Sequence, residues 1–164
     1  MEKQNILEVK VKVPENENII IGQSHFIKTV EDLYECLASS SPHLKFGLAF
    51  NEASGERLIR YDGNDDSLIK ESIDISSKIG AGHSFVIVLK EGYPINVMNK
   101  IKEVDEVASI YVATSNPITV IVYDDGKDGR GILGVIDGSK PLGVEDENGR
   151  KKRHKFLRDI GYKR

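Results

Sequence analysis

The sequence feature that most constrains the fold is an unbroken apolar run, Phe85–Leu89, which reads Phe-Val-Ile-Val-Leu. A short run of this kind, mostly β-branched and without polar alternation, is typical of a strand that is covered on both faces. It follows the segment Gly80-Ala81-Gly82-His83-Ser84, whose two glycines permit backbone conformations that other residues disfavour. The sequence therefore predicts a central strand that carries an imidazole and a hydroxyl at its mouth.

Apolar periodicity predicts further strands and helices on both sides of this run. Strands are expected at about 7–13, 19–21, 45–50, 58–61, 110–113, 118–123 and 132–136, and helices at about 29–39, at about 68–80 and from Pro94 onward. Thr29 followed by Asp32 resembles a capping box at the start of the first helix. Because strands alternate with helices and two strand pairs are adjacent, we expect one α/β domain, residues 1–164, with helices on both sides of a mixed sheet.

The charge of the chain is unevenly distributed. The formal net charge is -3, which indicates no general affinity for nucleic acid or for an anionic membrane. Residues 150–164 contain eight basic residues and one acidic residue, so they carry +7 and leave -10 on residues 1–149. A solvated charged helix is the first interpretation of this basic C-terminal segment, and docking to nucleic acid, phosphate or an acidic neighbouring subunit is the alternative.

The expected compartment is the cytoplasm. Cys36 is the only cysteine, so an intrachain disulfide is impossible and a reducing environment is indicated. The sequence lacks an apolar run of the roughly 18 residues that a membrane span needs, and residues 1–5 lack the features of a signal peptide. We therefore expect no membrane partner.

Polar residues gather where the predicted strands begin or end. The clusters are Asn51-Glu52-Ala53-Ser54, His83-Ser84, Ser115-Asn116 and Arg130-Gly131, with Asp137 after the last strand, and Ser24 follows the strand at 19–21. Ligands of α/β proteins collect at strand ends, where loops converge on a rigid sheet. Any one of these clusters alone is explained by turn formation, but their number favours a pocket.

Two histidines are candidates for catalysis. His83 and His25 each lie near a glycine and beside a serine, and a neutral imidazole can exchange protons or attack phosphorus. The alternative for each is a partly buried histidine with a structural hydrogen bond. Arg130 lies between two glycines and is suited to binding a phosphate or carboxylate, unless it is a solvated loop cation. Asp137 could act as a base or a metal ligand, or could cap the turn at Gly138.

Five stretches of the chain closely resemble the adenosine-specific kinase family. They are residues 22–29, 45–55, 80–85, 94–97 and 130–138, and the resemblance covers nearly the whole chain in order. It implies a three-layer α/β/α protein with a mixed sheet, assembled as a homotrimer or homohexamer, that binds adenosine or AMP in preference to ADP or ATP. It also implies a phosphohistidine intermediate and does not choose between His25 and His83.

The sequence contains no P-loop, no Gly-x-Gly-x-x-Gly fingerprint and no zinc-spaced Cys/His cluster, so a nucleotide would be bound by an unusual route. Hydrogen bonds to base and ribose are expected from Asn51, Glu52, Asn96 and Asn116, stacking from Phe26, Phe50 or Tyr93, and phosphoryl binding from Arg130, Ser84 and the backbone of residues 80–82. No cofactor is certain, although a Mg²⁺ ion could accompany the phosphoryl donor. The alternatives to a phosphotransferase are a non-catalytic adenosine or AMP sensor and, with less support, nucleic-acid binding through the basic segment.

Overall fold

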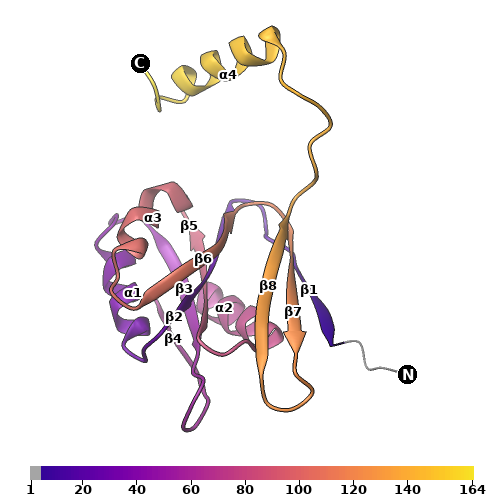
Figure 1. Cartoon of the computed structure of the whole chain (residues 1–164). Coiled ribbons are helices and arrows are strands. Elements are labelled where there is room, and N and C mark those ends of the chain that lie inside the picture. Colours follow the sequence, from indigo (N-terminus) through magenta and orange to yellow (C-terminus); the bar gives the residue numbers. More distant parts are fainter. Residues whose placement is uncertain (1–4) are drawn as a thin grey trace.

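The computed structural model describes residues 5–164, and Figure 1 shows the arrangement of their helices and strands. The elements follow the chain in the order β1 (Ile6–Val11), β2 (Glu17–Ser24), α1 (Thr29–Ala38), β3 (Lys45–Asn51), β4 (Ile59–Gly63), α2 (Asp66–Ile79), β5 (Ser84–Lys90), α3 (Pro94–Lys102), β6 (Val107–Thr114), β7 (Ile118–Asp124), β8 (Arg130–Asp137) and α4 (Glu147–Asp159). The α/β class expected from the sequence is confirmed.

The strands form two sheets, one with the order β4-β3-β5-β2-β6 and one with the order β1-β7-β8. All of their pairs are antiparallel, so the arrangement differs from the single mixed sheet that the alternation of elements suggested. The connections explain the difference. The strands that a helix joins, such as β2 and β3, run in the same direction, but each such pair has an antiparallel strand between its members.

The five-stranded sheet has helices on both faces, as expected. On one face, α1 and α3 cover a core that includes Phe46, Phe50 and Phe85. On the other face, α2 and the three-stranded sheet cover a second core built from Ile75, Val86 and their neighbours. The central strand β5 contributes alternate side chains to the two cores, and Phe85–Leu89 is buried throughout. The prediction of a central strand covered on both faces is confirmed.

The helix ends have identifiable caps. Asp65 accepts hydrogen bonds from the backbone N–H groups of Ser67 and Leu68 at the start of α2, and Gly80 ends this helix in the left-handed conformation (φ 61°). The capping box predicted at Thr29 is wrong, because Lys28 is the N-cap of α1 and makes no side-chain cap bond. The Thr29 hydroxyl instead bonds the Ser24 hydroxyl, at 2.6 Å, and the Phe26 carbonyl, which ties the start of α1 to the end of β2.

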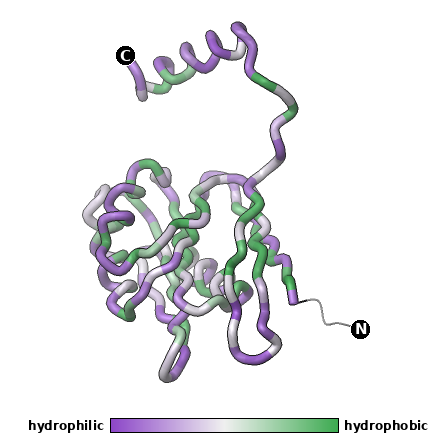
Figure 2. The backbone as a smooth tube through the Cα atoms, in the orientation of Figure 1, coloured by the Kyte–Doolittle hydropathy of each residue, from purple (hydrophilic) through white to green (hydrophobic). Residues whose placement is uncertain are grey.

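The C-terminal residues extend away from the two sheets. After β8 the chain runs through residues 139–146 without regular structure and then forms α4 (Figure 1). None of the residues of α4 is buried, and the hydropathy view shows that it is mostly hydrophilic (Figure 2). A charged helix is present in the C-terminal segment, and it is exposed within this one chain. In the described part of the chain, every helix is too short or too polar to span a membrane.

Candidate functional site

His83 is held in an unusual conformation at the mouth of β5. Its φ of 63° lies in the left-handed region, which a non-glycine residue adopts at some energetic cost. Two backbone hydrogen bonds hold it there, because its N–H donates to the Asn51 carbonyl at 2.7 Å and its carbonyl accepts from the Ser24 N–H at 2.9 Å. The half-buried imidazole stacks on Phe50, with ring centroids 5.9 Å apart and an interplanar angle of 11°. The fold therefore fixes this imidazole at a sheet end.

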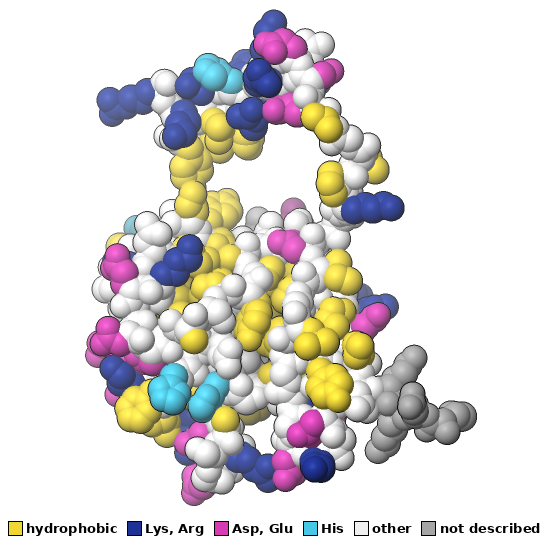
Figure 3. All heavy atoms as spheres, viewed as in Figure 1, with side chains coloured by type: hydrophobic (Ala, Val, Ile, Leu, Met, Phe, Trp, Pro, Cys, Tyr) yellow, Lys and Arg dark blue, Asp and Glu magenta, His cyan; other side chains and the backbone are white. Residues whose placement is uncertain are grey.

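His25 lies directly beside it. The two imidazole centroids are 5.9 Å apart and the rings meet edge to face. Two histidine side chains lie next to each other on the face drawn in Figure 3. His25 is exposed in the turn after β2, where its N–H donates to the Glu106 carbonyl at 3.0 Å. The antiparallel pairing of β2 with β5 brings the end of one strand next to the start of the other. The structure thus joins the two candidate histidines, 58 residues apart in sequence, into one pair.

Three of the predicted polar residues are buried next to this pair. The buried Asn51 amide donates to the Ser76 carbonyl at 3.1 Å and to the Ser84 hydroxyl at 3.0 Å. The Ser84 hydroxyl donates in turn to the Ala81 carbonyl at 2.6 Å. Ser24 is also buried. The side-chain bonds of Asn51 and Ser84, together with the bond from the Ser24 N–H to the His83 carbonyl, hold the loop that carries His83.

Arg130, at the start of β8, lies close to the same loop. Its Nη1 is 3.4 Å from the Lys78 carbonyl, and a Cβ added to Gly80 would come within 3.1 Å of Nη1. Its Nε forms an ion pair with Asp124 Oδ2 at 2.8 Å. The neighbouring Gly131 is exposed. A guanidinium therefore borders the histidine loop, although part of its hydrogen-bonding capacity is already used.

Glu52 follows β3 and precedes Ala53, whose side chain lies next to Gly82 of the loop. Its carboxylate pairs with the Arg60 guanidinium, with Oε2 2.9 Å from Nη2 and 3.1 Å from Nε. Asn51 and Glu52 are adjacent at the end of β3, so the end of this strand contributes both the support of His83 and a nearby ion pair.

The remaining predicted site residues lie at the opposite end of the sheets. Asn96 accepts a hydrogen bond from the Tyr93 N–H at 2.8 Å, which caps α3 beyond the far end of β5. Asp137 accepts from the Thr114 hydroxyl at 2.9 Å and from the Asn116 amide at 3.0 Å. At about 3.3 Å per residue, the length of β5 puts about 20 Å between the histidine pair and this end. One small ligand cannot contact both groups at once.

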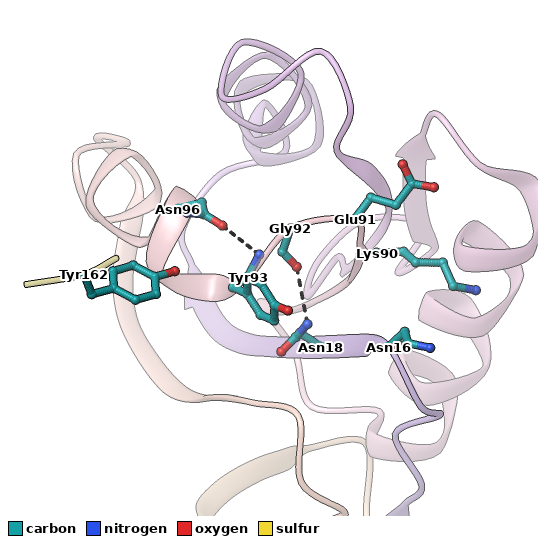
Figure 4. Close-up of a pocket in the computed structure, with 8 residues that line it drawn as sticks. All are labelled: Asn16, Asn18, Lys90, Glu91, Gly92, Tyr93, Asn96 and Tyr162. Atoms are coloured by element: carbon teal, nitrogen blue, oxygen red, sulfur yellow. Dashed lines mark hydrogen bonds between the residues drawn. The ribbon is translucent and has the colours of Figure 1, made fainter. Parts of the chain in front are cut away.

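A groove of about 670 Å³ lies at this second end. It is lined by Asn16, Asn18, Lys90, Glu91, Gly92, Tyr93, Asn96 and Tyr162. Figure 4 shows the ring of Tyr162, from the C-terminal residues, on the same side of the groove as Tyr93 and Asn96, while the Asn18 amide donates to the Gly92 carbonyl. The groove combines aromatic faces with amide groups, which are the side chains that bind a planar, polar ring.

Sequence reasoning missed Glu106 beside the histidine pair. Its side chain is only 3% exposed and lies 3.6 Å from the Lys28 ammonium. Burial raises the pKa of the Glu106 carboxyl, and its neighbour Asp32 raises it further. The sequence offers little signal for this residue, because Glu106 lies in an acidic loop that reads as solvent-exposed.

The surroundings of Asp137 do not fit the role of a Mg²⁺ ligand. Among residues 5–164, no three His, Cys, Asp or Glu side chains are grouped so that they could hold a metal ion. Asp137 accepts hydrogen bonds from Thr114 and Asn116 and lies at the end of β8 remote from Arg130. The described residues around Asp137 therefore do not form a protein-built Mg²⁺ site.

Comparisons with known proteins agree with the resemblance seen in the sequence. The family model described as "Adenosine specific kinase" matches residues 9–163. The crystal structure of PH1918 protein from Pyrococcus horikoshii OT3 is similar, with 44% sequence identity, a TM-score of 0.92, and coverage of 97% of this chain and 98% of that one. A comparison with curated proteins gave no match. Since the family model spans nearly the whole chain, this protein belongs to the adenosine specific kinase family.

Proposed function

We propose that this protein binds adenosine or AMP at the histidine pair and transfers a phosphoryl group through a phosphohistidine. The observation that carries the proposal is the pairing of His83 with His25, whose ring centroids are 5.9 Å apart. The backbone of His83 is held in the strained left-handed conformation. Strained residues concentrate at functional sites, because the surrounding structure must hold them in place. The family match supports an adenosine-related substrate.

His83 is the better nucleophile of the two. Stacking on Phe50 and two backbone hydrogen bonds restrict its imidazole, whereas His25 is exposed in a turn. A neutral ring nitrogen of His83 attacks the phosphorus of a donor, an N–P bond forms and the donor's P–O bond breaks. A ribose hydroxyl then attacks the phosphorus, the N–P bond breaks and its electron pair returns to the imidazole. His25, next to the reacting ring, accepts the hydroxyl proton.

Arg130 and the backbone around Gly80 border this loop and are the proposed partners of the phosphoryl oxygens. A guanidinium suits this role because it presents several N–H donors in one plane. The exposed Phe26 follows His25, and Glu52 is the first residue after β3. We assign adenine stacking to Phe26 and ribose binding to Glu52. To bind the ribose, the Glu52 carboxylate would give up part of its contact with Arg60 and accept a hydrogen bond from a ribose hydroxyl.

The test is intact-mass analysis after incubation with ATP, acetyl phosphate or pyrophosphate, followed by addition of adenosine. We expect an acid-labile gain of one phosphoryl group that adenosine discharges, retained in His43→Asn and lost in His83→Asn. His43 is an exposed loop histidine and is the matched control. Labelling that persists in His83→Asn would refute the assignment, and the absence of labelling with all three donors would refute the phosphotransferase.

A specific observation supports the alternative, a non-catalytic adenosine or AMP sensor. The groove at Tyr93 and Asn96 offers aromatic and amide groups, but lies about 20 Å from the histidines at the spacing of residues in a strand. A nucleoside bound there could not receive a phosphoryl group from His83 of the same chain. Isothermal titration distinguishes the two sites: loss of adenosine binding in Tyr93→Ala but not in Phe26→Ala would favour the sensor, and the reverse result would favour the histidine site.

Two further expectations complete the proposal. The family resemblance implies a homotrimer or homohexamer, and the single Cys36 thiol fits a reducing, cytoplasmic location. Sedimentation velocity and cell fractionation test these expectations.

A further inference from the structure

Residues 139–164, here called the arm, carry apolar side chains that their own chain does not cover. Leu142 and Val144 are 102% and 99% exposed, whereas Phe156 and Ile160 on α4 are 59% and 46% exposed and border a cavity that they share with Tyr93 and Ile95. Leu142 and Val144 flank Gly143 in the segment without regular structure between β8 and α4. An isolated helix as short as α4 is marginal in water, since tertiary packing supplies most helical stability. The arm therefore needs a surface to pack on.

The charges of the arm and of the rest of the chain are opposite. The arm contains nine basic and four acidic residues, a net charge of +5, which leaves -8 on residues 1–138 of a chain whose total is -3. A second copy of this chain therefore attracts the arm electrostatically. Nucleic acid would also attract the basic residues, but phosphate contacts give no role to Leu142 and Val144.

A matching apolar surface lies on the three-stranded sheet. On the side that faces away from the core, Leu133 and Ile136 of β8 are 61% and 54% exposed, and Tyr123 of β7 and Ile6 of β1 are also exposed. The water-facing side of an antiparallel sheet is normally polar. We call these four side chains the outer face; apolar side chains are visible on this part of the molecule in Figure 3.

Gly131 and Gly134 of β8 have no side chains, so no side chain projects from the sheet at these two positions. A Cβ added to Gly131 or Gly134 would meet no atom within 4 Å, so the space above both residues is open. In the structure the arm runs away from this sheet, and α4 lies beyond the far ends of β5 and β6, where Tyr162 borders the Tyr93 groove (Figure 1). The arm thus leaves the outer face of its own chain uncovered.

We propose that the arm of one copy docks on the outer face of a second copy, with Leu142 and Val144 packing against Leu133 and Ile136. Each copy has both an arm and an outer face, so two copies can exchange arms reciprocally, or successive copies can join head-to-tail and close into a ring if the rotation between them permits it. The proposal does not depend on the phosphoryl chemistry. It assigns a function to the basic C-terminal segment that the histidine site does not use.

The first test measures mass in solution by light scattering and sedimentation velocity. The 18.2 kDa chain is expected to form a multiple of its mass. The double variant Leu142→Asp/Val144→Asp removes two side chains that have no contacts within the chain, so it should fold normally yet associate at least about a hundredfold more weakly, since burial of each contributes roughly tenfold or more. Ser139→Asp/Asn148→Asp adds the same two charges to exposed positions of the arm and should keep the wild-type mass.

The second test uses complementation between two defective chains. Leu133→Asp/Ile136→Asp, on the outer face, should also be monomeric, with an unchanged circular dichroism spectrum. Mixed with Leu142→Asp/Val144→Asp, it should form a heterodimer, because one chain still has an intact arm and the other an intact outer face. A monomeric wild-type protein, wild-type association by either double variant, or a mixture that stays monomeric would each overturn the proposal.

Discussion

Substitution of Asn51 tests how the fold holds the histidine loop. The Asn51 side chain is buried and donates to two acceptors, the Ser76 carbonyl at 3.1 Å and the Ser84 hydroxyl at 3.0 Å. One bond ties β3 to the end of α2 and the other ties it to the start of β5, on either side of Gly80–His83. The substitution Asn51→Ala removes both bonds while the backbone hydrogen bond from His83 to the Asn51 carbonyl stays possible.

The expected loss of stability follows from these two bonds. Each intramolecular hydrogen bond contributes roughly 0.5–1.5 kcal/mol net, so their loss should lower the free energy of unfolding by roughly 1–3 kcal/mol. The Ser76 carbonyl still accepts from the Gly80 N–H at 2.8 Å, which places the expected value in the lower half of this range. The Ser84 hydroxyl keeps its bond to the Ala81 carbonyl.

Urea unfolding followed by circular dichroism measures this loss, and a double-mutant cycle with Ser84→Ala isolates the Asn51–Ser84 bond. We expect a coupling free energy of roughly 0.5–1.5 kcal/mol between the two sites. Asn99→Ala, on the exposed side of α3, is the control and should change stability by less than about 0.5 kcal/mol. Histidine phosphorylation should fall in Asn51→Ala under conditions where the protein is fully folded.

The reasoning would be refuted by an Asn51→Ala variant that unfolds at the wild-type urea concentration, or by a coupling free energy of zero. The first result would mean that water replaces both bonds without cost. The second would mean that Ser84 is positioned independently of Asn51. Full phosphorylation of a destabilised Asn51→Ala variant would show that the loop geometry does not control the reactivity of His83.

Two further predictions concern packing and pH. Gly47→Ala should lower the free energy of unfolding by roughly 1–3 kcal/mol or more in urea titrations, because the added Cβ would come within 2.2 Å of the Leu68 backbone in α2. Gly134→Ala is the control and should unfold like wild type, because its added Cβ would meet no atom within 4 Å. Burial, followed by the hydrogen bond and charge of Glu17, raises the pKa of Glu71 from its ordinary 4.5 to about 7. Folding therefore favours the protonated carboxyl, and this contribution is full below about pH 4.5 and is lost as the pH rises through 7. Stability measured from pH 4.5 to 8 should decline less in Glu71→Gln than in wild type, and an equal decline in both would contradict the assignment.

Local pattern was sufficient to predict most of the elements. Each helix and strand expected from apolar periodicity is present, and the uninterrupted run at Phe85–Leu89 is the buried central strand β5. These predictions succeed because burial is recorded in the order of apolar residues. A helix with one buried face repeats them every 3.6 residues, a strand with one buried face repeats them every 2 residues, and a strand buried on both faces is a continuous apolar run. The capping box at Thr29 failed because Lys28 is the N-cap of α1 and the Thr29 hydroxyl bonds Ser24 and Phe26, which lie before the helix.

The grouping of the candidate residues was beyond sequence reasoning. Polar residues at strand ends suggested one pocket, but the antiparallel order of the strands divides them between two ends. His83 and His25 meet because β2 and β5 are antiparallel neighbours, and the same order places Asn96 and Asp137 at the far end. The sequence by itself determined which segments become strands and helices, and that two histidines lie at strand ends. Only the tertiary structure decided which strand ends face each other, because strand pairing depends on contacts between residues far apart in the chain, which no local repeat encodes.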